Sequence, residues 1–218
     1  MKFSLLALAI AAVAPFSAQA SELNYNYVEA DYASSHLAGT TAGGYNFKGS
    51  MAFGDSFYGA FTYGQVSKNR IDSGLVTGTG SPILFDADLS NTTVSLGFRH
   101  AISDKADFYS ELGYARSNLG LDVRGFGKGS ESGNGYRIAA GVRGMLTDQF
   151  EGNFNVNYAD VGNAGNGVGV GIGGIYHIND TWGITGNYDY ATRGNVSFGG
   201  VAIDETIKTW SIGVRASF

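Results

Sequence analysis

Hydrophobic and polar residues alternate along most of the chain with a period of two. Successive side chains of a β-strand point to opposite faces, so this period predicts strands with one apolar and one polar face. The last segment shows the pattern clearly, because the residues between its hydrophobic positions are polar or small. Those hydrophobic positions are Trp210, Ile212, Val214, Ala216 and Phe218.

Ten segments share this alternation, and turns separate them. They lie near residues 23–33, 42–53, 57–66, 91–100, 107–118, 134–146, 150–160, 167–177, 182–192 and 204–218. Short turns alternate with longer connections rich in glycine, serine and asparagine, at about 34–41, 67–90, 119–133, 161–166 and 193–203. This order predicts an all-β fold, a ten-stranded antiparallel up-and-down barrel, with eight strands as the alternative count.

The direction of the apolar face separates a soluble barrel from a membrane barrel. A soluble barrel turns its apolar face inward, whereas a membrane barrel turns it toward lipid and has a polar interior. The charges on the polar faces fit either case, because a soluble protein could carry them on a solvated surface. The aromatic residues are more informative, since they gather at both ends of the apolar stripes.

Phenylalanine and tryptophan gather near the short turns, and tyrosines gather near the long connections. The spacing of the two groups along a strand, at about 3.3 Å per residue, spans much of an apolar band about 25 Å tall. Two aromatic belts are typical of the two membrane interfaces, so the sequence favours a transmembrane β-barrel with both chain ends in the periplasm. The first group is Phe53, Phe57, Phe98, Phe108, Phe150, Tyr176 and Trp182, and the second is Tyr32, Tyr45, Tyr63, Tyr114, Tyr136, Tyr158 and Tyr190.

The first twenty residues do not share the alternation. Lys2 precedes an apolar run that ends near Val13, and Ala18 and Ala20 give the small-x-small pattern of a cleavage site before Ser21. The run is shorter than the roughly 20 residues that a membrane-spanning helix needs, so a secretory signal peptide is favoured over an anchor. We therefore expect a signal peptide at 1–20 and a barrel domain at 21–218.

The composition narrows the possible functions. Charged residues make up 15% of the chain, below the roughly one quarter of an average soluble domain. The absence of cysteine excludes disulfides, zinc sites with cysteine ligands and thiol catalysis. A formal net charge of −5 argues against binding of nucleic acid through a basic surface.

The end of the chain adds a signal of a different kind. A terminal Phe218, with a hydrophobic residue at each second position back to Trp210, resembles the assembly signal of outer-membrane β-barrels. That resemblance implies the barrel-assembly machinery as a partner during biogenesis and outer-membrane lipid as the surroundings of the finished protein.

Four stretches resemble a family of small outer-membrane proteins of xanthomonads, once named activators of rice receptor-mediated immunity. They read LNYNYVEADY at 23–32, KGSMAFGDSFYGAFTYGQ at 48–65, GYRIAAGVRGMLTDQFEGN at 135–153 and NDTWGITGNYDYA at 179–191. The chain departs from the family in a longer 67–90 connection and a more glycine-rich GVGVGIGGIY at 167–176. The resemblance implies an outer-membrane or vesicle-borne Gram-negative protein linked to surface behaviour, and it implies a location more than a mechanism.

One glycine-rich motif matches the spacing of a dinucleotide-binding loop. Gly169, Gly171 and Gly174 have this spacing, but that chemistry needs a helix N-terminus after the glycines, and no helical pattern follows. We expect instead that the inward glycines at 169, 171 and 173 leave room for long lumen side chains.

The sequence gives only weak evidence for a catalytic or metal-binding site. A barrel enzyme needs a base, usually histidine, near the outer rim with a carboxylate or serine partner. Only His36 lies in an outer connection, whereas His100 and His177 are expected at the periplasmic interface. Asp86 and Asp88 lack the ligand spacing of a calcium loop. We therefore predict no catalytic residues, no metal, no cofactor and no enzymatic activity.

Inward-facing charges are the most informative set of candidate residues. Five acids and five bases fall on the polar faces, and in a narrow lumen such charges pair rather than remain singly desolvated. The acids are Glu29, Asp31, Glu111, Glu151 and Asp189, and the bases are Lys48, Arg99, Arg137, Arg143 and Arg215.

This charge set leads to two hypotheses about function. In the first, the network plugs the barrel, and the protein is a non-enzymatic surface protein whose loops serve adhesion, biofilm formation or host recognition through an unknown extracellular partner. In the second, the same groups line a small passive porin-like channel. The glycine-rich inner faces favour the channel, because they leave volume unfilled.

Overall fold

A computed structural model describes residues 23–218 except 38, 77–81, 124, 126 and 199–200. The predicted signal peptide and its cleavage site at Ala18, Ala20 and Ser21 lie outside the described residues. They stay predictions.

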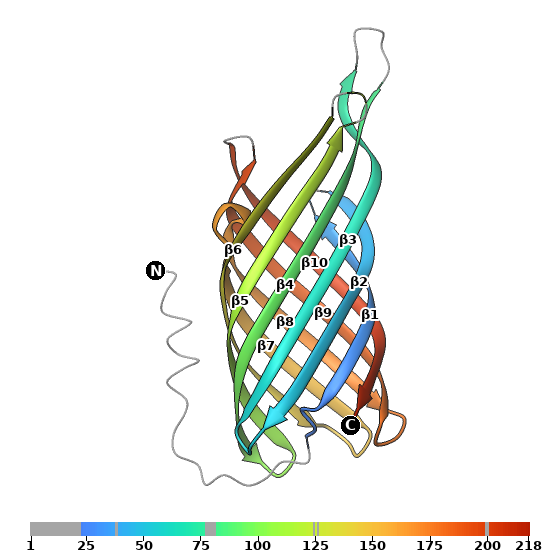
Figure 1. Ribbon diagram of the computed structural model, residues 1–218. Helices are drawn as coiled ribbons and strands as arrows, with labels where there is room; N and C mark the ends of the chain where they lie inside the picture. Colours follow the sequence, from blue (N-terminus) through green and yellow to red (C-terminus); the bar gives the residue numbers. More distant parts are fainter. Residues whose placement is uncertain (1–22, 38, 77–81, 124, 126, 199–200) are drawn as a thin grey trace.

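Ten antiparallel strands form one closed barrel, in which each strand pairs with its neighbours in the sequence and β1 pairs with β10 (Figure 1). The predicted all-β fold and the count of ten strands are confirmed. The strands are β1 (Tyr27–Leu37), β2 (Thr40–Phe53), β3 (Phe57–Val76), β4 (Pro82–Ser103), β5 (Ala106–Val123), β6 (Gly127–Met145), β7 (Phe150–Asp160), β8 (Asn166–His177), β9 (Trp182–Phe198) and β10 (Val201–Ser217).

A single short 3-10 helix, η1 (Gly162–Ala164), connects β7 to β8 and is the one helix in the described part of the chain. Among the residues described, there is no helix with the length and hydropathy required to span a membrane.

The outward face of the barrel is apolar, as the alternation predicts. Leu112 is 61% exposed, and in the register of the sheet it lies between Leu96 of β4 and Ile138 of β6. Such a row of exposed aliphatic side chains suits a hydrocarbon environment and would be costly in water.

Aromatic side chains border this apolar band on both sides. At the short-turn end, Phe53 stacks against Phe57, and Phe57 packs edge-on against Phe98. At the other end, Tyr114 pairs with Tyr136 in the register of β5 and β6. The predicted belts therefore lie on the lipid-facing surface, where they suit the two headgroup interfaces.

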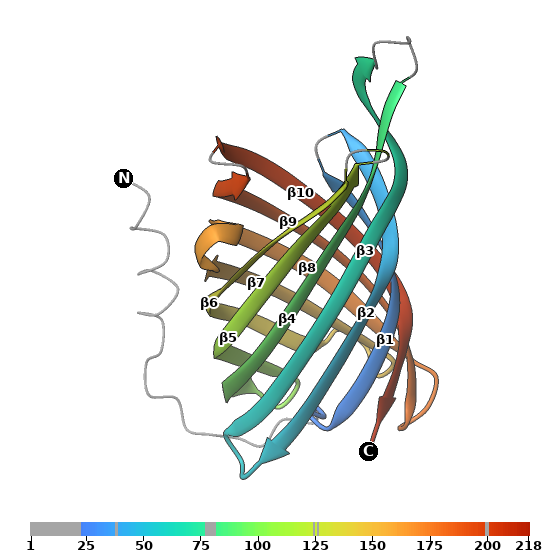
Figure 2. The ribbon, with the colours of Figure 1, turned by 45° about the horizontal axis from the view of Figure 1, so that its top comes forward.

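The predicted connections at 67–90 and 119–133 are wrong, because both are mostly strand. β3 and β4 remain paired out to Val76 and Pro82, and β5 and β6 remain paired out to Val123 and Gly127. In contrast, the pairing of β2 with β3 ends at Ser67, so the extended hairpins rise beyond the rest of the rim (Figures 1 and 2). Outside the membrane both faces of a strand are solvated, so no apolar alternation is required there.

The predicted start of the first strand is also wrong. β1 begins at Tyr27, whereas residues 23–26 precede the strand. These four residues lie at the periplasmic end of the barrel, where Leu23 and Tyr25 are buried.

The outward band generates a test of membrane orientation. Leu112→Arg places a charge in hydrocarbon and is expected to lower the free energy of unfolding by about 2–4 kcal/mol. Ser130→Arg, on the exposed part of β6 beyond the rim, is the control and should change it by less than about 0.5 kcal/mol. Urea unfolding in lipid vesicles measures both, and equal losses would contradict the orientation.

Candidate functional site in the barrel lumen

The chain's own N-terminal segment closes the periplasmic end of the lumen. We call Leu23–Asn26 the floor segment. Tyr25 is 3% exposed, and its ring packs 4.8 Å from the ring of Tyr58. The guanidinium groups of Arg99 and Arg143 lie 4.7 Å and 4.4 Å from the centre of the Tyr25 ring. Two cation–π contacts and buried aromatic area hold the segment inside the barrel.

The same arginines also bind the backbone of the floor segment. Arg99 Nη1 donates to Leu23 O at 3.4 Å, and Arg143 Nη2 donates to Asn24 O at 3.2 Å. The last residue of the chain completes the anchor, because Phe218 N donates to Asn26 O at 3.0 Å. Side chains of β4 and β6 and the C-terminal residue therefore fix the floor segment.

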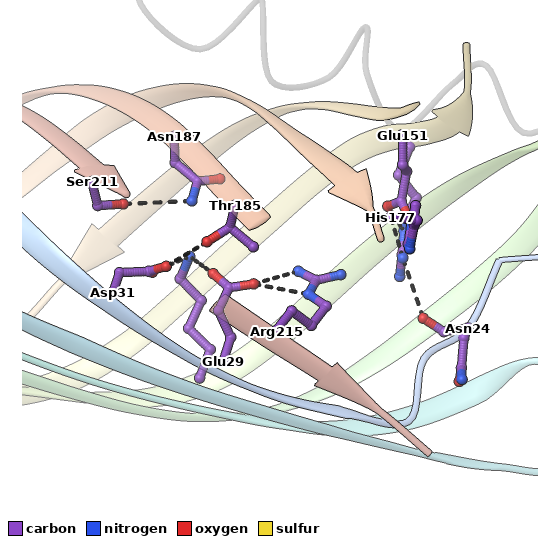
Figure 3. A network of polar contacts seen from close by, with 11 residues as sticks. Asn24, Glu29, Asp31, Glu151, His177, Thr185, Asn187, Ser211 and Arg215 are labelled. Carbon is purple, nitrogen blue, oxygen red and sulfur yellow. Dashed lines mark hydrogen bonds and ion pairs between the residues drawn. The ribbon is translucent and has the colours of Figure 1, made fainter. Parts of the chain in front are cut away.

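A cluster of four charges lies beside the floor segment (Figure 3). Glu29 of β1 accepts hydrogen bonds from Lys48 of β2 at 2.5 Å and from Arg215 of β10 at 2.7 Å. Lys48 also lies 3.2 Å from Asp31, whose other oxygen accepts from Thr185 Oγ1 at 2.7 Å. Because Glu29 and Asp31 are buried, these partners are what make the two carboxylates tolerable inside the barrel.

Two further ion pairs cross neighbouring strands. Arg143 Nη2 lies 2.7 Å from Glu151 Oε1, and His177 Nε2 lies 3.4 Å from the other oxygen of Glu151. Higher in the lumen, Arg137 pairs with Glu111 at 3.0 Å. All of these side chains come from the inward positions of their strands.

Two of the ten predicted lumen charges take part in no ion pair among the described residues. Arg99 binds backbone carbonyls and the Tyr25 ring. The Asp189 carboxylate faces the lumen cavity, and no described group forms a hydrogen bond or ion pair with it.

The sequence reasoning missed two inward charges. Asp107 of β5 is 1% exposed and lies near the Tyr25 hydroxyl. Arg193 of β9 reaches across the upper lumen, where it donates to Asn91 Oδ1 at 3.2 Å and Ser117 Oγ at 3.4 Å. Asp107 stands two positions before Tyr109 and four before Glu111, so the alternation could have placed it on the inward face. Arg193 lies just beyond the predicted strand end. With these two, the described lumen holds six acids and six bases.

The prediction for the inward glycines is confirmed. A side chain on Gly169, Gly171 or Gly173 would collide with polar side chains that reach over β8 from its neighbours. Those neighbours are Asn153, Asn155 and Asn157 of β7 and Asn187 and Asp189 of β9.

The histidines do not form a rim site. His36 contacts Thr41 Oγ1 at 3.2 Å, and the register of β4 puts His100 on the lipid-facing side between Phe98 and Ile102. His177 was expected at the membrane interface, but its contact with Glu151 places it inside the lumen. In the described part of the chain, no three histidine or acidic side chains gather as a metal site.

The candidate calcium residues also have an ordinary role. Asp86 Oδ1 accepts a hydrogen bond from the backbone N of Arg70 at 2.7 Å. Arg70 has a φ of 58°, so this bond supports the bulge in the β3–β4 hairpin.

Above the floor segment, the lumen contains a polar cavity of about 330 Å³. Its wall combines asparagine and threonine side chains with the paired charges and with the rings of Tyr58 and Tyr109. The arrangement can hold water or a small polar solute. The described residues place no nucleophile beside a base and an orienting acid, which acyl-transfer chemistry requires.

Comparison with known proteins gives a family match. The model of the outer membrane protein beta-barrel domain matches residues 3–167. No curated protein matches the sequence.

Several solved barrels are similar to this chain at low identity. Ail, the attachment invasion locus protein of Yersinia pestis, is 15% identical with a TM-score of 0.44, and the match covers 88% of this chain and 95% of Ail. Neisserial surface protein A is 14% identical with a TM-score of 0.42, covering 88% and 96%. OprG of Pseudomonas aeruginosa is 12% identical with a TM-score of 0.42, covering 93% and 99%.

The buried pair of Arg143 and Glu151 generates a stability prediction. Arg143→Ala leaves a buried carboxylate without its arginine, and the free energy of unfolding should fall by about 3–5 kcal/mol. The exposed pair of Lys105 and Asp148, at 3.5 Å, is the control, and Lys105→Ala should cost about 0–1 kcal/mol. Urea unfolding of both variants measures the difference.

A double variant separates charge pairing from packing. Arg143→Ala with Glu151→Ala removes both charges, so it should recover part of the loss seen for Arg143→Ala alone. No recovery would mean that the pair does not govern stability here.

Proposed function

The chain belongs to the outer membrane protein beta-barrel family, and we propose that this Gram-negative outer-membrane protein acts as a non-enzymatic surface protein through its extended hairpins. The observation that carries the proposal is the asymmetry of the barrel. The hairpins β3–β4 and β5–β6 project beyond the rim, whereas the floor segment fills the opposite end. A sheet that projects from a barrel closed at its other end presents its surface to the outside of the cell.

The projecting sheet has features that suit contact with another surface. Among the described residues, β3 has no partner strand on the side of β2 beyond Ser67, and β6 has none on the side of β7 before Tyr136. The exposed part of β6 is rich in glycine and serine, and Lys128 pairs with Asp122 across the hairpin at 3.0 Å. Unpaired strand edges offer backbone donors and acceptors to a partner.

The similarity to the xanthomonad family supports the same role. That family is linked to surface behaviour, so adhesion, biofilm formation or host recognition is the role we propose, with release in outer-membrane vesicles as a further route to a host. The extracellular partner belongs to this proposal.

We also propose that the barrel-assembly machinery reads the last strand. Trp210, Ile212 and Val214 are half or more exposed on the lipid-facing side of β10, with Ala216 in the same row. Phe218, directly after the strand, is 65% exposed. Outer-membrane lipid would cover this row after assembly.

A second candidate, a small passive channel, is favoured by one observation. The cavity of about 330 Å³ is lined by polar and charged side chains, as a passage for water or small solutes would be. Passage would require the floor segment to leave its place, because Tyr25 and Leu23 occupy the periplasmic end.

Shortening the hairpins tests the proposed surface role. Replacing residues 69–86 by Asn-Gly closes the first hairpin at the Lys68–Ala87 pair, and replacing 119–131 by Asn-Gly closes the second at Asn118–Ser132. Adhesion of cells that carry the shortened barrel should fall at least about fivefold, because the unpaired edges are removed.

The control makes the same kind of change at the other end of the barrel. Replacing Thr147-Asp148-Gln149 by Asn-Gly alters a periplasmic turn and should leave adhesion unchanged. A heat-dependent gel shift shows that each variant is folded. Unchanged adhesion in folded, shortened barrels would contradict the proposal.

A further inference from the structure

Uncharged hydrogen-bonding groups make up much of the wall of the lumen cavity. Five asparagines and two threonines line it, together with the hydroxyl-bearing rings of Tyr58 and Tyr109. Amides and hydroxyls both donate and accept hydrogen bonds, so this wall suits a ligand that does the same. The asparagines are Asn46, Asn91, Asn153, Asn155 and Asn187.

The basic side chains that line the cavity are already bound to acidic side chains. Lys48 and Arg215 are bound to Glu29, Arg137 to Glu111, and Arg143 to Glu151. An anionic ligand would have to displace a carboxylate from one of these basic groups, whereas a neutral ligand leaves the pairs intact. The wall therefore selects against ligands with a net negative charge.

Asp189 is the exception, because its carboxylate faces the cavity and none of the described groups binds it. It lies over Gly171 next to Asn155. A Cβ placed on Gly171 would be 2.5 Å from Asp189 Oδ1 and 2.6 Å from Asn155 Nδ2. A strong acceptor and an amide donor therefore sit side by side, which matches two adjacent hydroxyl groups of one molecule.

The aromatic rings offer a second type of contact. Tyr58 and Tyr109 lie flat against the inner wall, since a Cβ on Gly141 would be only 2.7 Å from the Tyr109 ring and one on Gly97 would overlap the Tyr58 ring. The Tyr25 ring already packs against Tyr58, so the half-buried Tyr109 is the ring that can pack against the C–H groups of a ligand ring whose edges carry hydroxyls. The volume of about 330 Å³ lies at the low end for ligand sites, so the ligand is small.

We propose that this cavity binds a small, polyhydroxylated solute of the monosaccharide class that carries no negative charge, with Asp189 and Asn155 as its main hydrogen-bonding partners. The solute enters from the cell exterior, because the floor segment fills the periplasmic end. Arg193 crosses this path and is held there by the neutral groups of Asn91 and Ser117. The binding site is separate from the projecting hairpins, so this proposal does not depend on the proposed surface role.

Three pyranoses that differ in charge test the proposal. Saturation-transfer NMR on the refolded barrel in detergent would use D-glucose, D-glucosamine and D-glucuronate as probes. Glucose and glucosamine should bind more tightly than glucuronate, since the carboxylate of glucuronate would meet Asp189 and could find a basic partner only by breaking an ion pair of the wall. The heat-dependent gel shift confirms that the barrel is folded in each sample.

Two pairs of variants locate the binding. Gly171→Ala puts a methyl group where Asp189 and Asn155 meet, and it should weaken glucose binding at least about tenfold. Gly186→Ala is its control on the neighbouring strand, since a Cβ there meets nothing within 4 Å. Asp189→Asn keeps the shape of the site and should weaken binding about threefold to tenfold, whereas Asp180→Asn in an exposed turn should not.

Three results would each overturn the proposal. They are the absence of glucose binding to the folded barrel, preferred binding of glucuronate, and equal glucose binding by Gly171→Ala and Gly186→Ala. The hairpin-shortened barrel should bind glucose as the full barrel does, which separates this test from the test of adhesion.

Discussion

The closed ring of backbone hydrogen bonds is the constraint on which the rest of the structure depends. In hydrocarbon each unsatisfied backbone group is costly, so the sheet must close, and it does so between β1 and β10. Closure fixes which side chains face lipid and which face the lumen. The lipid-facing side can then be largely apolar, and most polar and charged groups of the membrane-spanning part are confined to a narrow interior.

The interior meets this confinement in two ways. Charges pair across neighbouring strands, as Glu29 does with Lys48 and Arg215, so that few are left desolvated alone. Large inward side chains lie opposite glycine, as Asp189 lies over Gly171. At the periplasmic end, the floor segment fills the space that remains, while the polar cavity persists above it. A barrel built in this way closes one end of its lumen with its own chain.

Much of this could be predicted from the sequence, because alternation is a local property. The bounds of β7 are as predicted, and those of β8 differ by one residue. The alternation also predicts that Glu29 and Arg215 point into the lumen. Their contact, however, joins residues 186 positions apart and depends on closure of the barrel. The outer halves of β3 and β4 escaped prediction because strands that are solvated on both faces need no alternation. The floor segment escaped for another reason. Its residues also alternate, but Leu23 and Tyr25 hold the odd positions that are polar in β1. The contact that fixes the segment in the lumen joins Asn24 to Arg143, 119 positions away.

The central claim is that the floor segment and the paired charges close the lumen, and single-channel current in a planar bilayer tests it most directly. The refolded barrel should give no discrete steps. Tyr25→Ala, which removes the ring between Arg99 and Arg143, should give small and repeatable ones. Steady ohmic steps from the unaltered barrel would contradict the claim and would make the lumen charges the lining of a pore.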